Sequence, residues 1–192
     1  MEKVLVFLAD GFEEVEALTP VDFLRRAGIV VDTVSTKEDK KVVGSHKIPV
    51  LADKLIAEID PKDYSLAYIP GGIPGATNLR DDQKVIDLIK AIDQNKGRVA
   101  AICAGPIVLE RAGLLAGKEA TSFPGFDKDL ESVKTYVDDQ LVVVDGNIIT
   151  GRGPAIALYE ALKLVEILKG KEAKEELKNQ LQQDKVEKYF GF

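Results

Sequence analysis

The sequence predicts one doubly wound α/β domain with a mostly parallel central sheet. Along its 192 residues, short apolar runs alternate with longer amphipathic stretches, as strands alternate with connecting helices in this fold class. Glycine-containing turns follow several of the apolar runs, and one run leads through a sharp turn at Cys103 directly into a helical stretch. The length suits one sizeable core, so we expect residues 1–192 to form a single domain.

The N-terminal part of the chain predicts two strands, a helix and a small hairpin. Residues 4–8 are continuously apolar, as in a strand buried on both faces. Apolar side chains recur at helical spacing over residues 13–26, and Pro20 is expected to bend or restart this helix. Residues 29–35 predict the second strand. Residues 41–50, interrupted by a Gly-Ser pair, predict a hairpin beside the main sheet.

The middle of the chain predicts two more strands of the central sheet. Residues 65–69 are an apolar run that ends at a Pro-Gly-Gly turn, and a helix capped by Asp81 or Asp82 comes later. Residues 97–102 predict the next strand, and residues 104–113 predict a short helix that stops at a glycine.

The C-terminal part predicts a hairpin and two helices. Residues 141–144 and 148–150 are apolar runs around an Asp-Gly turn, which favours a hairpin. Pro154 opens a long amphipathic helix, and Gly170 ends it. Residues 171–185 predict a final, charged amphipathic helix.

Composition excludes several classes of function. The net charge is −6 and the basic residues are interspersed with acidic ones, so neither a nucleic acid nor a membrane is an expected partner. We see no signal peptide and no apolar run of transmembrane length, and a single cysteine fits the reducing cytoplasm. One Cys and one His are too few for protein-ligated zinc, which leaves only carboxylate sites for a metal. Dinucleotide- and phosphate-binding glycine patterns are absent, so we expect no cofactor.

Cys103, the only cysteine, occupies the predicted strand-to-helix turn among small residues. This is the arrangement of a nucleophile elbow, with Cys in place of the Ser of the G-x-S-x-G pattern. The partial positive charge at a helix N-terminus favours the thiolate, which is the reactive form of cysteine. A lone cysteine is more often a small buried apolar side chain, but its place at the elbow favours a nucleophile.

Three loops are expected to meet at one edge of the sheet, because ligands of such sheets bind beyond the carboxyl ends of the strands. The loop after the first strand leads to Glu16, whose carboxyl in a partly apolar pocket would have a raised pKa. The other two loops contain Gly72 and Ala104, whose backbone N–H groups could stabilise a developing alkoxide. A tight turn is the simpler explanation of Gly72.

Neighbouring polar residues have simpler interpretations. Glu13 and Glu14 lie in the first turn of the predicted helix, where carboxylates complement the helix dipole, so capping suffices to explain them. His46, the only histidine, lies in the predicted hairpin and is interpreted as a solvated turn residue. A Cys–His pair would require His46 to reach Cys103, for example from a second subunit.

Several of these segments together resemble the DJ-1/ThiJ/PfpI superfamily, most closely its DJ-1 and YajL branch. The resemblance covers residues 3–170 and rests on separate motifs in order: GFEEVE at 11–16, PVDFLRRAG at 20–28, PGG at 70–72, AAICAGP at 100–106 and TGRGP at 150–154. It implies a flavodoxin-like sandwich, usually homodimeric, in which Cys103 matches an easily oxidised nucleophilic cysteine. By the same resemblance, Glu16 matches the carboxyl that hydrogen-bonds to this cysteine, and Gly72 and Ala104 match the backbone donors around the sulfur.

Two positions depart from the family pattern. In the protease-like PfpI branch a histidine directly follows the cysteine, and here that position is Ala104, which argues against a peptidase. In the DJ-1 branch a histidine lies in the segment that matches residues 121–124, and here that position is Phe123. Proton transfer therefore falls to Glu16. A class I amidotransferase-like glutaminase shares the elbow but also needs a positioned histidine.

Two functions remain open. The first is a cofactor-independent glyoxalase- or deglycase-like enzyme that acts on reactive α-oxoaldehydes or their early adducts, including glycated side chains. Cys103 would add to the aldehyde, and Glu16 would move a proton between neighbouring carbons. The second is an oxidative-stress sensor with a chaperone-like output, in which Cys103 is oxidised to sulfinic acid beside a protonated Glu16. The choice of substrate follows from the resemblance alone.

Overall fold

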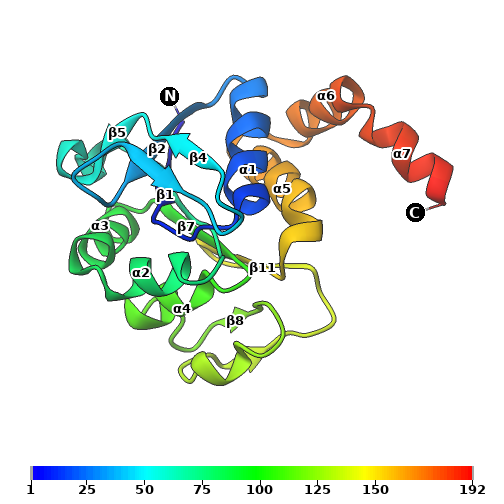
Figure 1. The fold of residues 1–192 in the computed structure, drawn as a ribbon. Coiled ribbons are helices and arrows are strands. Elements are labelled where there is room, and N and C mark those ends of the chain that lie inside the picture. Colours follow the sequence, from blue (N-terminus) through cyan, green and yellow to red (C-terminus); the bar gives the residue numbers. More distant parts are fainter. Residues whose placement is uncertain (1, 192) are drawn as a thin grey trace.

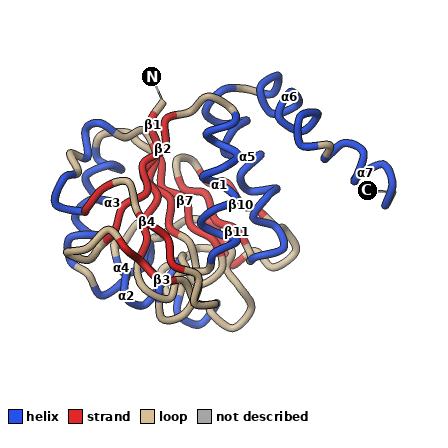
Figure 2. Tube along the Cα trace, turned by 45° about the horizontal axis from the view of Figure 1, so that its top comes forward, coloured by secondary structure: helices blue, strands red, loops and turns tan. Residues whose placement is uncertain are grey.

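The fold is a central sheet between two layers of helices (Figures 1 and 2). The computed structural model describes residues 2–191. The sheet consists of seven strands: β1 (Lys3–Leu8), β2 (Val30–Ser35), β5 (Lys54–Leu55), β6 (Leu66–Ile69), β7 (Arg98–Ile102), β10 (Val142–Asp145) and β11 (Ile148–Gly151). Their order is β10-β11-β7-β6-β1-β2-β5, and all neighbours are parallel except β10 and β11. The predicted α/β class with a mostly parallel, doubly wound sheet is confirmed.

Helices cover both faces of the sheet. One layer consists of α1 (Glu14–Arg26) and α5 (Ala157–Lys169), and the other of α2 (Gly75–Asp81), α3 (Gln83–Gln94) and α4 (Pro106–Arg111). Because successive side chains of a strand point to opposite faces, β1 contributes to both cores. Val4 and Val6 pack with the α1–α5 layer, whereas Leu5 and Phe7 pack with the other layer. All four side chains are fully buried, which explains the continuous apolar run.

A hairpin of β3 (Lys41–Val43) and β4 (Pro49–Leu51) lies outside the main sheet, as predicted. Two backbone–backbone hydrogen bonds join it to the loop after β1. The Gly11 N–H donates to the carbonyl of Val43 (2.8 Å), and the Ser45 N–H donates to the carbonyl of Phe12 (2.8 Å). The hairpin is therefore fixed beside the first loop of the candidate site.

Some helices differ from the prediction. The helix α1 continues through Pro20, where only the hydrogen bond to the carbonyl of Glu16 is lost. The predicted final helix is divided into α6 (Lys171–Leu181) and α7 (Gln183–Phe190), because Gln182 adopts a left-handed conformation at φ 60°. Both extend away from the sheet (Figure 1). Within residues 2–191, no helix combines the length and apolar character needed to cross a bilayer.

Several short elements were not predicted from the sequence. The helix α2 replaces an expected loop, because the N–H groups of Gly75 and Ala76 donate to the carbonyls of Gly11 and Gly72 and start a helix there. The other unpredicted elements are a small parallel sheet of β8 (Glu119–Ala120) and β9 (Thr135–Tyr136), and 3-10 turns at Ile56–Glu58, Pro61–Asp63, Asp127–Asp129 and Pro154–Ile156.

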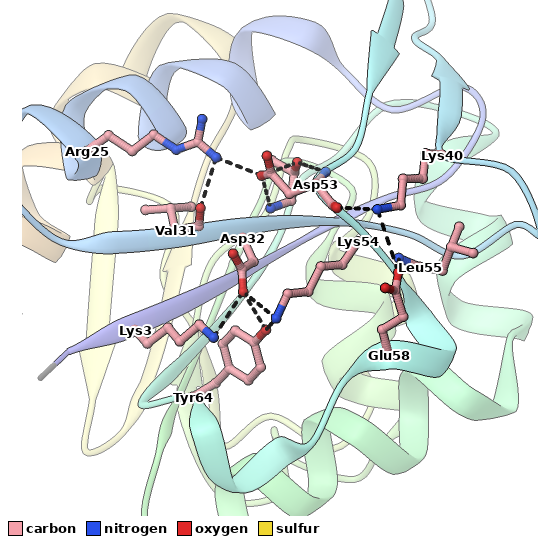
Figure 3. Close-up of polar contacts among 11 residues, drawn as sticks. Lys3, Arg25, Val31, Asp32, Lys40, Asp53, Lys54, Leu55, Glu58 and Tyr64 are labelled. Carbon is pink, nitrogen blue, oxygen red and sulfur yellow. Dashed lines mark hydrogen bonds and ion pairs between the residues drawn. The ribbon is translucent and has the colours of Figure 1, made fainter.

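A polar network fixes the β2–β5 edge of the sheet (Figure 3). Asp32 on β2 accepts a hydrogen bond from the hydroxyl of Tyr64 (2.7 Å). Its Oδ2 also pairs with the Nζ atoms of Lys3 and Lys54, each at 3.1 Å. Burial acts to raise the pKa of Asp32, but these three partners outweigh it, so the pKa is lowered. The network thus holds a short edge strand through charge-assisted hydrogen bonds.

Candidate active site

Cys103 lies in the turn between β7 and α4, with its backbone in the left-handed region at φ 62°. For a residue other than glycine this conformation costs roughly 1–2 kcal/mol. Two backbone hydrogen bonds hold the residue in place. The Cys103 N–H donates to the carbonyl of Gly151 (2.9 Å), and the Phe123 N–H donates to the carbonyl of Cys103 (2.9 Å). The half-buried thiol is therefore carried by a rigid strand-to-helix elbow.

Glu16 approaches the elbow from the first turns of α1. Its side chain is fully buried, and its Oε2 accepts a hydrogen bond from the N–H of Gly71 (2.9 Å). The Cys103 thiol acts to lower the pKa of the same carboxyl, whose Oε1 has no hydrogen-bond partner among the described residues. Because β1, β6 and β7 are neighbours in the sheet, the segments that follow them meet at its carboxyl edge.

Gly71 lies between Glu16 and Cys103 and leaves no room for a side chain. A Cβ at this position would lie 2.6 Å from Glu16 Oε2 and 2.7 Å from Cys103 Cβ. The backbone N–H groups of Gly72 and Ala104 act to lower the pKa of the thiol. The structure thus brings all four predicted site residues together.

Burial controls the protonation of the Glu16–Cys103 pair. Desolvation raises the pKa of Glu16 to about 7, against the lowering effect of its hydrogen bonds with Cys103 and Gly71. Desolvation, followed by the charge of Glu16, raises the pKa of Cys103 to about 12. Desolvation and the charge of Glu16 thus oppose the helix N-terminus, which was expected to favour a thiolate at Cys103. Glu16 therefore titrates near neutral pH beside a thiol whose ionisation burial disfavours.

A second buried carboxyl lies behind the elbow. Glu160 of α5 is fully buried, and the Tyr68 hydroxyl on β6 donates to its Oε2 (3.1 Å). Its Oε1 has no hydrogen-bond partner among the described residues. The carboxyl packs on Gly151, where a Cβ would lie 2.8 Å from Oε2. Desolvation, more than the nearby charge of Glu16, raises the pKa of Glu160, so this carboxyl holds its proton to a higher pH than an exposed one.

Glu13, Glu14 and His46 fasten the hairpin onto the start of α1. The side chain of Glu13 makes no capping hydrogen bond, contrary to the prediction. The Ser45 hydroxyl lies within hydrogen-bond distance of both carboxylates, at 3.1 Å from Glu13 and 3.2 Å from Glu14. Glu14 is buried and accepts from the N–H of His46 (2.8 Å), because a buried carboxylate needs donors.

His46 is exposed, as predicted, but it is not simply solvated. Its Nδ1 lies 2.9 Å from Glu14 Oε2, so the ring is paired with Glu14 and not with Cys103. The hydrogen bond with Glu14 raises the pKa of His46. The ligand atoms of Glu13, Glu14 and His46 lie within 4.8 Å of one another, a spacing at which they could also hold a metal ion.

Sequence reasoning missed four residues around the elbow: Gly71, Gly151, Tyr68 and Glu160. Both glycines lie inside motifs noted in the sequence, where a glycine signals close packing. Glu160 lies four residues before Leu164 in the buried stripe of α5, so a carboxyl at a core position of the helix was the available signal. Tyr68 gave no signal of its own.

Comparisons with known proteins place this geometry in a family. Residues 2–167 match the DJ-1/PfpI family. The protein dj-1beta of Drosophila melanogaster is 39% identical over 176 residues, which cover 92% of this chain and 94% of that one. The crystal structure of Drosophila melanogaster DJ-1beta aligns with a TM-score of 0.90 and 38% identity, covering 94% of this chain and 97% of that one. Oxidised Toxoplasma gondii DJ-1 aligns with a TM-score of 0.88 and 37% identity, covering 95% and 98%.

Proposed function

The chain belongs to the DJ-1/PfpI family, and on that premise we propose that it converts α-oxoaldehydes such as methylglyoxal into 2-hydroxy acids without a cofactor. The observation that carries the proposal is a fully buried Glu16 carboxyl placed against Gly71 beside Cys103, with its Oε1 unpartnered among the described residues. With a pKa of about 7, Glu16 accepts and returns a proton near neutral pH. Base and nucleophile are therefore paired before the substrate binds.

The first step joins the substrate to the enzyme. As the Cys103 sulfur forms a bond to the aldehyde carbon, the thiol proton passes to the Glu16 carboxylate, and the carbonyl oxygen becomes an alkoxide. The N–H groups of Gly72 and Ala104 stabilise this charge, and Glu16 then protonates the oxygen to give a hemithioacetal. Burial disfavours the thiolate, so the attack needs a base beside the thiol, and Glu16 is the carboxyl in that position.

The second step moves hydrogen between carbons. The Glu16 carboxylate removes the proton from the hemithioacetal carbon and delivers it to the ketone oxygen, which gives an enediol. Glu16 then takes the hydroxyl proton of the first carbon and delivers a proton to the neighbouring carbon. The product is a thioester of the 2-hydroxy acid on Cys103. Water attacks the thioester carbonyl, the acid leaves, and the thiol is restored, so that one aldehyde and one water give one acid. The same steps on an early adduct of a glycated side chain would amount to deglycation.

The proposal is tested by steady-state conversion of methylglyoxal to lactate, with a readout that separates the enantiomers. We expect stereoselective turnover by the wild type and none by Cys103→Ser. Glu16→Gln keeps the shape of the side chain but cannot accept a proton, so we expect turnover to fall by about 10²–10⁴-fold. Wild-type turnover that does not exceed that of Cys103→Ser would rule out the proposal for this substrate. A Tris-free buffer avoids adducts with the aldehyde.

A second candidate function is an oxidative-stress sensor. The specific observation in its favour is that Glu16 is half protonated near neutral pH and bonded to the sulfur, so it could donate to a sulfinate on Cys103. One aligned relative, Toxoplasma gondii DJ-1, is described in an oxidised form. Peroxide titration followed by intact mass separates the two functions. A sensor gains two oxygens on Cys103 at low peroxide and shows no aldehyde turnover.

We further propose that the chain forms a homodimer through α1 and the hairpin. Val15, Ile48 and Leu51 are half or more exposed. The N–H groups of His46 and Ile48 donate to Glu14 and keep the two elements adjacent. Exposed apolar side chains gathered on one face are typical of an interface. We expect Leu51→Lys to shift the mass measured by light scattering toward the monomer. An unchanged dimer mass would contradict this interface.

A further inference from the structure

An apolar groove lies beside the elbow, and the proposed steps do not use it. Its volume is about 190 Å³. Two segments form most of it: the loop after β8, with Phe123 and Pro124, and the connection from β11 to α5, with Pro154 and Ile156. Leu141, just before β10, completes the apolar wall. The groove thus combines side chains that are far apart in the sequence.

Backbone hydrogen bonds connect Cys103 to one segment of the groove and to the strand β11 that leads into the other. The Phe123 N–H donates to the Cys103 carbonyl, and the Gly151 carbonyl, three residues before Pro154, accepts from the Cys103 N–H. The Phe123 ring lies against Gly153, where a Cβ would be 2.9 Å from a ring carbon. The groove is therefore held in a fixed position relative to the nucleophile.

The groove offers little to a charged or polar group. Among the described residues that line it, Arg152 carries the only charge, and its Nη1 already donates to the carbonyl of Asp138. Its volume is several times the roughly 30 Å³ that one water molecule occupies in the liquid. A methyl group, which is about as large as a water molecule, would leave most of the groove unfilled.

We propose that this groove is the subsite for the group attached to the ketone carbon of the substrate, so that the protein prefers α-oxoaldehydes with a bulky apolar group, such as an aryl ring, over methylglyoxal. This inference rests on the proposed function, in which the aldehyde carbon bonds to Cys103 and the ketone carbon lies next to it. Phe123 then has a role that needs no proton transfer: its ring, 43% exposed, is a wall of the subsite. Filling an apolar pocket discriminates between substrates by about 10- to 200-fold.

The test uses alkylation of Cys103 by phenacyl bromide and by bromoacetone. Each reagent has a carbonyl next to its reactive carbon and carries the same substituents as phenylglyoxal and methylglyoxal. In both reactions the thiol loses its proton, a bond forms between sulfur and carbon, and bromide leaves. Because Cys103 is the only cysteine, intact mass reports its reaction alone. The measured quantity is the rate constant for phenacyl bromide divided by that for bromoacetone. This ratio is then divided by the same ratio measured with glutathione, which corrects for the intrinsic reactivity of the two reagents.

We expect this normalised ratio to be about tenfold for the wild type. Leu141→Asn and Phe123→Ala change exposed side chains of the groove and are expected to bring the ratio close to one. Val144→Asn is the matched control, because Val144 is also exposed and close to Leu141 but does not line the groove. A wild-type ratio near one, or a high ratio that both groove variants retain, would overturn the inference.

Turnover separates this inference from the proposed function. We expect kcat/KM for phenylglyoxal to exceed that for methylglyoxal by a similar factor, and this preference to fall in the same two variants. Alkylation needs no turnover, so a high alkylation ratio without conversion of either aldehyde would reject the proposed function and leave the groove as an aryl-binding site. Turnover of both aldehydes at equal kcat/KM would reject the subsite and leave the proposed function intact.

Discussion

Replacing Glu160 by Gln is expected to stabilise the protein, increasingly so as the pH rises. The unfolded chain releases the Glu160 proton around pH 4.5, whereas burial raises the pKa in the folded state. Between these two values the folded protein holds one more proton than the unfolded chain, so its stability falls by about 1.4 kcal/mol per pH unit. Gln titrates in neither state, and its carbonyl can still accept from Tyr68. As long as the pH stays below the raised pKa, the variant gains about 1.4 kcal/mol relative to the wild type for each pH unit.

The assay is urea-induced unfolding of both proteins at several values between about pH 5.5 and 7.5. Titration of Glu16 changes the free energy of unfolding of both proteins with pH. The difference in free energy between the two proteins therefore reports on Glu160. Tyr68→Phe is the matched control. It removes a hydrogen bond that lowers the pKa of Glu160, and so it should preserve the slope of the wild type. A difference between Glu160→Gln and wild type that does not change with pH would refute the assignment of a retained proton to this carboxyl.

Three other substitutions test the remaining structural claims. Gly71→Ala is expected to lower the free energy of unfolding in urea by about 1–3 kcal/mol, because its Cβ would overlap Glu16 Oε2. The same overlap should change the rate of Cys103 alkylation, and an unchanged rate would contradict the close packing at Gly71. Asp32→Asn is expected to cost about 1 kcal/mol near neutral pH. The stabilisation by Asp32 is complete above pH 3.8 and is lost as the pH falls through the lowered pKa, which acid titration of both proteins would show. His46→Gln should lower Tm at about pH 5.5 but much less at about pH 9. The raised pKa of His46 stabilises the fold fully below pH 6.5, and this stabilisation is lost as the pH rises through the raised pKa. Equal decreases of Tm at both pH values would contradict the pairing of His46 with Glu14.

The sequence predicted those parts of the fold whose signals are local. The apolar run at 65–69 and its Pro-Gly-Gly turn placed Gly72 at a strand end. Helical spacing placed Glu16 inside α1, and the rule for parallel sheets brought both toward Cys103. The structure shows these residues in contact, through Gly71. Their roles in catalysis stay predictions.

Features that depend on burial could not be predicted in this way. The helix N-terminus favours a thiolate at Cys103, but only the folded chain shows that desolvation and Glu16 act more strongly in the opposite direction. Likewise, the partnership of His46 with Glu14 requires the hairpin to fold back on α1, over more than thirty residues of sequence. Glutamine does not favour the left-handed conformation that Gln182 adopts, so its residue type did not indicate the break between α6 and α7.

Phe123 serves the elbow and the groove with different atoms. Its backbone N–H holds the carbonyl of Cys103, while its side chain only forms a wall beside Gly153. Any residue except proline provides that N–H. Position 123 is therefore a place where substrate preference can evolve, or be selected from a library, while the geometry of the nucleophile is inherited unchanged. Gly71 is the opposite case, because there the backbone and the missing side chain both belong to the site.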